Sequence, residues 1–147
     1  SEWYVSKLSA ELSYKDEDKA ILNFANQSIF LVKSKENQSS NFYDCYGEER
    51  FSITFEVNGL NALEAIHRDF KDKEISVGEI ENRGHSGRNF VFFDLDGNKF
   101  DVWSELSPIS VCGESRTYSM NIGEASYNFL GLSIYMNKVI NKERGNG

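Results

Sequence analysis

The chain has few cysteines and a deficit of basic residues, and each shortage excludes a class of protein. Its two cysteines, Cys45 and Cys112, lie far apart without a CxxC spacing, so we expect neither a zinc knuckle nor a disulfide framework, and a reducing cytoplasm fits best. Sixteen basic residues against 23 acidic ones give a net charge of −7. This balance argues against nucleic acid as a partner, because phosphate binding needs clustered Lys and Arg.

Long apolar runs are also missing. No run approaches the ~20 residues that a membrane span needs, and the start SEWYVSKLSAEL lacks the cationic and apolar regions of a signal peptide. We therefore expect a soluble protein with no membrane partner. The remaining partner classes are small molecules and other proteins.

The sequence does contain enough apolar and aromatic residues, 39% and 14% of the chain, for one packed domain. The short apolar runs AELSY, AILNF and SIFLV, separated by KDEDK and ANQ, predict three strands in a meander between Ala10 and Lys33. The preceding SEWYVSKL is weakly amphipathic and is typical of the end of a helix. The polar KENQSSNFYDCYGEER predicts a loop.

A second unit follows the loop. FSITFEV alternates like a strand, and NALEAIHRDFKDK places Leu63, Ile66 and Phe70 at helical spacing behind the cap candidate Asn61. EISVGEI, RNFVFFD and NKFDVWSE predict three more strands. The first segment has the same pattern without its opening strand. Of the last 42 residues, NFLGLSIYMNKVI favours a strand and SPISVCGESRTYSMNIGEAS favours a linker.

The acids of VFFDLDGNKFDVW admit three interpretations. The stretch resembles the nucleophile motif of haloacid dehalogenase phosphotransferases, but KFDVWSE alternates as a strand and no later magnesium-binding pattern follows. Asp94, Asp96 and Asn98 have the spacing of a calcium loop, but Lys99 occupies the position of its essential glycine. The third interpretation, which we favour, is a hairpin turn in which Asp and Gly serve the backbone.

As a hairpin, the stretch resembles the closing strands of the vicinal oxygen chelate superfamily, the glyoxalase, bleomycin-resistance and extradiol-dioxygenase group. FSITFEVNGLNALEAIHRDFKDKEISV is similar to its strand and helix, and EWYVSKLSAELSYKDEDKAILNFANQSIFLV to its first module. Leu95 replaces the proline of the family's turn, and the first module lacks its opening strand. The resemblance implies an α+β fold in which two βαβββ modules form a curved mixed sheet, with a concave ligand cup and helices outside.

The missing strand suggests a circularly permuted order within a single domain spanning residues 1–147. GLSIYMNKVINK resembles that strand, so module one would be residues 1–34 plus a strand from 129–136, and module two residues 51–105. Residues 107–127 would be a linker across the surface. We expect the strand to pair within the first module's sheet. The alternative is an unrelated tail or extra edge strand.

The resemblance also implies where a ligand would bind. The family's metal positions fall on Gly131 or Ser133, on Ser52 and on Asp101, and only Asp101 is a good ligand. The histidines His67 and His85 fall in the predicted helix and in a turn, so no metal site and no other cofactor is expected. Strand alternation turns Phe90, Phe92, Phe100 and Val102 toward the helices and Val91 into the cup. The expected ligand-binding residues are Asp101, Trp103, Phe93, Ser52, Thr54 and Tyr135, where a carboxylate beside an indole suits a cationic or hydrogen-bonding ligand.

Three functions remain open at this point. The leading hypothesis is a small-molecule-binding protein of this superfamily without a complete metal triad. The alternative is a divalent-metal-dependent lyase, isomerase or dioxygenase with an atypical site that uses Asp101, Glu56 or an acid of the 35–50 loop. The third is a protein-interaction module, which a cup filled by its own side chains would favour. We also expect a homodimer.

Overall fold

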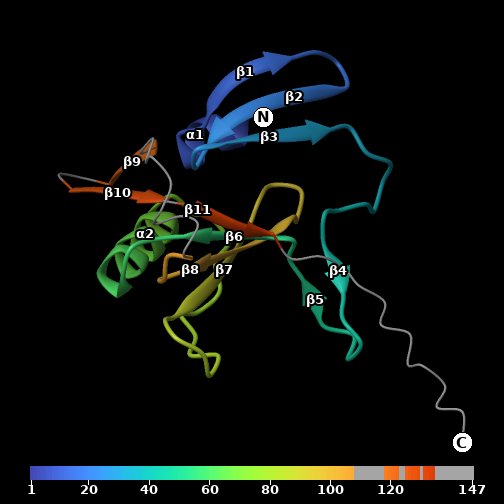
Figure 1. Cartoon of the computed structure of the whole chain (residues 1–147). Helices are drawn as coiled ribbons and strands as arrows, with labels where there is room; N and C mark the ends of the chain where they lie inside the picture. The colour runs from blue at the N-terminus through green and yellow to red at the C-terminus, as the bar shows by residue number, and fades with distance from the viewer. Residues whose placement is uncertain (108–117, 123–124, 130, 135–147) are drawn as a thin grey trace, which may run out of the picture.

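The computed structural model describes residues 1–107, 118–122, 125–129 and 131–134, in which two helices and eleven strands form (Figure 1). In chain order these elements are α1 (Glu2–Leu8), β1 (Glu11–Lys15), β2 (Lys19–Phe24), β3 (Gln27–Val32), β4 (Phe42–Tyr43), β5 (Glu49–Arg50), β6 (Ile53–Glu56), α2 (Leu60–Asp72), β7 (Asn89–Phe93), β8 (Lys99–Trp103), β9 (Tyr118–Ile122), β10 (Ala125–Phe129) and β11 (Gly131–Ile134). Neither helix is long and apolar enough to span a bilayer.

The first module is a helix followed by an antiparallel meander, as the apolar runs predicted. β2 lies between β1 and β3 in a three-stranded sheet. Ala25 and Asn26 alone connect β2 to β3, and both have positive φ, 54° and 61°. Two consecutive left-handed residues are the backbone of a type I′ turn, which matches the twist of a tight hairpin.

The second module builds a mixed sheet in the order β11-β6-β8-β7. β6 and β8 are parallel, whereas β7 and β8 form an antiparallel hairpin around the turn at residues 94–98. α2 lies along one face of this sheet (Figure 1). The predicted α+β class is confirmed.

Two details of this module differ from the prediction. The helix begins at Leu60 behind Gly59, not behind Asn61; Gly59 has φ 99°, and its amide donates to the carbonyl of Ser104. The segment EISVGEI forms no strand: Val77 within it bridges Phe92, and Glu81 directly after it bridges Asn89. From one bridge to the next this segment advances by four residues and β7 by three, so the pairing is irregular here. Gly78 lies within this stretch, where a Cβ would be 3.0 Å from a methyl of Val91.

The core lies between the helices and the two sheets. The predicted helix face is confirmed, because Leu63, Ile66 and Phe70 are fully buried. The four side chains predicted to face the helices are also buried in this cluster: Phe90, Phe92, Phe100 and Val102. Phe55 of β6 contacts Phe24 of β2 with ring centroids 4.9 Å apart, so the aromatic cluster joins the two modules.

The chain after residue 107 differs from the expected linker and strand. β9 and β10 pair antiparallel beside α2; β9 lies within the predicted linker 107–127, and β10 begins in it and ends at Phe129. The strand predicted over 129–136 forms as β11, but it pairs antiparallel with β6. Among the described residues it has no partner in the first sheet, so the expected pairing partner is wrong. Tyr135 and Met136 lie outside the described residues.

Candidate functional site

In the second sheet, residues at matching register positions on neighbouring strands form two rows that include polar residues. Both rows lie on the face of the sheet opposite the helices. Residues paired across neighbouring strands share a face, as do residues two apart on one strand. The first row is Ser133, Thr54, Asp101 and Val91, and the second is Gly131, Glu56, Trp103 and Asn89. We call this the polar face. It brings together Asp101, Thr54 and Trp103 of the predicted site, and Phe93 continues it along β7.

Ser52 is not part of this arrangement. It precedes β6, and its hydroxyl donates to the carbonyl of Ser40 at 3.1 Å. The β6 residue level with Asp101 is Thr54, two positions later.

Asp101 is the centre of the polar face and is fully buried. Its Oδ2 accepts hydrogen bonds from the Thr54 hydroxyl and the Asn89 side-chain amide, each at 2.9 Å. Its Oδ1 lies 3.0 Å from Nη1 of Arg83, an ion pair. Burial raises the pKa of the Asp101 carboxyl, and Arg83, Thr54 and Asn89 oppose that rise by favouring the charged form.

Arg83 and Asn89 are the site residues that the sequence did not reveal. Arg83 stands in the turn ENRGHSG, where its guanidinium lies over the ring of Phe51 and Nε donates to Glu81. A charged residue in a polar turn normally indicates a solvated surface. The usable signal was the buried Asp101 itself, because a carboxylate inside a sheet requires a cation or several donors nearby.

One acceptor on the polar face has no partner. Oδ1 of Asn89 is buried and accepts no hydrogen bond from the described residues. The orientation of this amide is fixed, because its nitrogen must face the acceptor-only oxygens of Asp101. An unpaired buried oxygen costs about 1–3 kcal/mol, so a donor from solvent or from a ligand would stabilise the folded protein by pairing with this atom.

Trp103 is held by the turn that carries Arg83. Its indole Nε1 donates to the carbonyl of Ser86 at 2.9 Å, and the ring of His85 lies edge-on with centroids 5.9 Å apart. A Cβ at Gly87 would be 2.9 Å from the indole nitrogen, so the turn packs directly on this side chain. Trp103 therefore offers a half-buried ring and no free N–H. The second histidine, His67, is buried in α2 with Nε2 2.8 Å from the carbonyl of Gly78.

The polar face does not fit a divalent metal ion. No cluster of three His, Cys, Asp or Glu side chains occurs in the part of the chain that the structure describes. Glu56 is also on this face, but it accepts from the amide and hydroxyl of Ser107 at 3.0 and 3.1 Å. The Arg83 guanidinium, 3.0 Å from Asp101, would repel a second cation there. In the 35–50 loop, Asp44 is engaged by Arg50 and by two backbone amides.

The acids of DLDG form a turn, as favoured above. Oδ1 of Asp94 accepts from the amides of Asp96 and Asn98 at 2.9 and 2.8 Å, and Oδ2 accepts from the Asn98 side chain and the Tyr4 hydroxyl. Gly97 supplies a positive φ of 84°. The antiparallel β7 and β8 contradict the phosphotransferase interpretation, and the filled coordination of Asp94 contradicts the calcium interpretation. Burial and Asp94 together raise the pKa of Tyr4.

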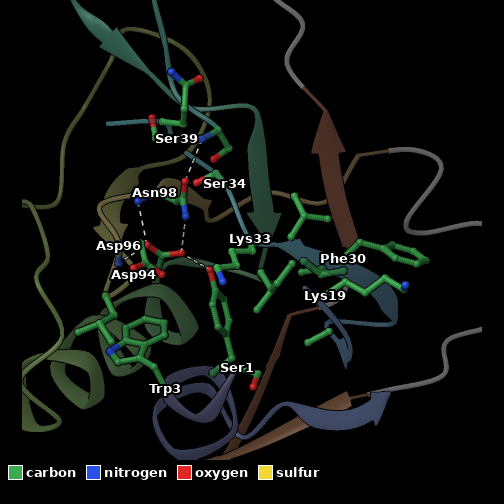
Figure 2. A pocket seen from close by; sticks show the side chains of 18 of the residues that line it. Ser1, Trp3, Lys19, Phe30, Lys33, Ser34, Ser39, Asp94, Asp96 and Asn98 are labelled. Atoms are coloured by element: carbon green, nitrogen blue, oxygen red, sulfur yellow. Dashed lines mark hydrogen bonds between the residues drawn. The ribbon is translucent and has the colours of Figure 1, made fainter. Parts of the chain in front are cut away.

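A separate groove of about 1090 Å³ lies between the first module and this turn (Figure 2). The apolar side chains Ile29, Leu31, Ile53 and Phe100 line it together with the start of α1 and residues 33–40. Ile53 and Phe100 alternate with Thr54 and Asp101, so the groove is on the opposite side of the second sheet from the polar face. Segments distant in sequence contribute to it, which is why no local pattern predicted it.

No protein-family model matches the chain, and a search of curated proteins found no significant match. Solved structures do match. FosX, a fosfomycin resistance protein from Listeria monocytogenes, aligns with a TM-score of 0.56 at 15% identity over 71% of this chain and 79% of that one. A lactoylglutathione lyase from Agrobacterium tumefaciens aligns with a TM-score of 0.53 at 16% identity over 69% and 79%.

A glyoxalase/bleomycin resistance protein/dioxygenase from Alicyclobacillus acidocaldarius aligns with a TM-score of 0.52 at 15% identity over 69% of this chain and 77% of that one. At such identities the likeness establishes the fold and no more. The chain has the fold of the vicinal oxygen chelate superfamily, as the sequence resemblance predicted.

Proposed function

We propose that this protein binds a small organic molecule on the polar face without a metal ion. The observation that carries the proposal is the unpaired, buried Oδ1 of Asn89 beside the Asp101–Arg83 ion pair. A ligand that donates an N–H or O–H to this oxygen recovers the cost of leaving it unpaired. Recognition by a buried acceptor also rejects analogues that lack the donor.

The surroundings define the rest of the ligand. Val91, Phe93 and Trp103 are half-buried and provide an apolar wall next to the polar centre. Thr54 and Asp101 are fully buried, so they act by holding Asn89 and Arg83 in place. Because Arg83 already neutralises Asp101, a hydrogen-bond donor suits this site better than the cation expected from the sequence. A few fixed polar groups within an apolar wall are typical of small-molecule sites.

The structural neighbours support a small-molecule role, and one differs in the chemistry of its site. A FosX variant from Listeria monocytogenes is known in complex with Mn(II) and a dihydroxypropylphosphonic acid. In this chain the guanidinium of Arg83 stands where a cation would have to approach Asp101. We therefore favour binding over metal-dependent lyase, isomerase or dioxygenase activity.

A thermal-shift screen tests the proposal. The panel holds antibiotics and metabolites in pairs that differ only by methylation of one amide or hydroxyl group. A ligand of the native state raises the melting temperature, and only the unmethylated member of a pair should do so. Asn89→Leu should abolish the shift, whereas Asn61→Leu, an exposed position on α2, should preserve it.

Metal analysis of the purified protein is the measurement that could contradict the metal-free proposal. Protein purified without chelators should contain no stoichiometric zinc, iron, manganese or nickel. A stoichiometric metal that is lost in Asp101→Asn but retained in Asn61→Leu would overturn the metal-free proposal and favour the enzyme.

A further inference from the structure

The outer edge of β3 has no strand partner among the described residues. In a two-residue hairpin the residues flanking the turn form a hydrogen-bonded pair, and such pairs then alternate along the strands. Every second residue from Gln27 therefore directs its amide to β2, and the bond from the Lys33 amide to the Asp18 carbonyl at 2.7 Å continues this series. The amides and carbonyls that point away from β2, where no described strand pairs with them, belong to Ser28, Phe30 and Val32.

The two edges of this sheet differ in how they are protected. β1 carries a register shift between Leu12 and Tyr14 and charged residues at both ends, features that block pairing with another strand. β3 reads QSIFLV, with no charge, no proline and a regular register. Phe30 and Val32 are 64% and 72% exposed. An apolar, regular edge of this kind can accept another extended segment by main-chain hydrogen bonding.

The groove described above runs along this edge. Ile29 and Leu31 line it and pack against the core, as does Ile53 from the second module, so these side chains form an apolar floor. Phe30 and Val32 also line the groove, but alternation directs their side chains to the other face of the sheet. A strand paired with β3 therefore has one row of side chains over the apolar floor and a second row on the exposed side.

The rim of the groove is acidic. Seven acidic side chains and four lysines line it. Glu17 and Glu36 are exposed and form no ion pair with any described residue, and Asp96 lies across the groove from Phe30 in Figure 2. A surplus of one sign of charge along a groove attracts ligands of the opposite sign. The groove therefore suits a basic occupant.

We propose that this groove binds an extended peptide segment of another protein, in which apolar and basic residues alternate. The segment adds a fourth strand to the first sheet by pairing with Ser28, Phe30 and Val32. Its apolar side chains lie over the floor, and its basic side chains extend past Phe30 toward the acidic rim, where their aliphatic stems cover the exposed ring. A second copy of this chain, with its net charge of −7, suits such a rim less well. The groove and the polar face are on opposite sides of the second sheet, so this site is independent of the function proposed above.

A capped hexapeptide of alternating lysine and valine is the probe. Added to the full chain, it should slow exchange of the Ser28, Phe30 and Val32 amides at least about tenfold, since paired backbone exchanges only on local opening. Its binding should weaken as salt is raised. The matched hexapeptide with glutamate in place of lysine should not bind.

Methylated peptides separate strand pairing from non-specific apolar contact. Every second amide of a bound strand faces β3. N-methylation of the lysine residues and N-methylation of the valine residues should therefore have opposite results, one abolishing binding and the other preserving it. Equal binding of the two methylated peptides would overturn the proposal.

Variants of β3 test the same contact from the protein side. Phe30→Pro removes an outward amide but no bond to β2, so it should weaken peptide binding at least about tenfold. Phe30→Val keeps the amide and should retain binding. Slow exchange of the Ile29 and Leu31 amides reports that β3 still pairs with β2 in each variant. If Phe30→Pro does not fold, the methylated peptides still decide the question.

A charge-matched pair of variants tests the rim. Glu17→Gln/Glu36→Gln should weaken peptide binding about two- to fivefold. Glu48→Gln/Glu79→Gln removes the same charge at exposed positions outside the groove lining and should leave binding unchanged.

The peptide-free protein distinguishes the other occupants. Slow exchange of the three outward amides at every protein concentration would show that the chain covers its own edge, and would overturn the proposal. Protection that rises with protein concentration would instead assign the edge to a second copy. Peptide binding that leaves these amides unprotected, or that is lost in Asn89→Leu, would place the peptide elsewhere.

Discussion

Replacing Arg83 with methionine should be the most damaging change at the polar face. The variant keeps most of the side-chain volume but leaves the Asp101 carboxylate, which is fully buried, without its cation 3.0 Å away. Removing one partner of a buried ion pair costs about 3–5 kcal/mol. The Arg83 side chain is 23% exposed, so solvent screens part of the interaction and we expect a loss of about 3 kcal/mol. For a domain of this size that loss lowers the melting temperature by about 6–12 °C.

The pH dependence identifies the mechanism. The pKa of Asp101 is raised by burial even with Arg83 present, so the folded state binds more protons than the unfolded state above the unfolded pKa of about 4. Stability from this group is therefore lost as pH rises through that window. Without Arg83 the folded pKa rises further, because the guanidinium opposes the rise. Arg83→Met should therefore lower the free energy of unfolding by more at pH 7 than at pH 4.5.

Urea unfolding at the two pH values measures this deficit. Arg68→Met serves as the control, because Arg68 is exposed on α2 and its replacement should change stability by no more than about 0.5 kcal/mol. Equal stability of the two variants at pH 7 would refute the role of the ion pair. A deficit that is the same at pH 4.5 and pH 7 would show that lost packing, and not charge, is responsible.

Three further predictions concern the rest of the fold. Tyr4→Phe removes the hydroxyl that donates to the buried Asp94, and urea unfolding should show a loss of about 1–2 kcal/mol, against less than that for Tyr14→Phe at an exposed site. The chain should form a homodimer, and light scattering that gives a monomer mass over a wide concentration range would contradict this. Deletion of residues 128–147 removes β11 from β6 and should abolish soluble expression, so a folded, soluble truncation would count against its structural role.

Local patterns predicted the parts of the fold whose signal is contained within one segment. α2 was correct because Leu63, Ile66 and Phe70 recur at helical spacing and all face the core. The β7–β8 hairpin was correct because Asp94 and Gly97 carry turn chemistry between two alternating runs. In both cases one side of the element is buried, so apolar residues recur along the sequence with the period of that helix or strand.

The rest depended on contacts between distant segments. EISVGEI alternates like a strand, but it and the following Glu81 pair with β7 only through two isolated bridges, which are out of register with each other by one residue. Asp101 could be predicted because it lies on a strand whose residues alternate between apolar and polar. Its partner Arg83 lies in a turn, where the sequence has no such alternation. No local rule predicts which turn folds over which strand, so the carboxylate of Asp101 could be predicted and its cationic partner could not.

The position of β11 bears on the circular order, which stays a proposal. A first strand of module one would have to lie where the two modules meet. Apart from β11, the second sheet runs from β6 to β7, and β6 is the end nearest that junction because Phe55 of β6 contacts Phe24 of the first sheet. β11 pairs with β6 and not with β7. An unrelated tail could add to either edge, so the choice of β6 supports the permuted order. Its hydrogen-bonded partner among the described residues still belongs to the second module.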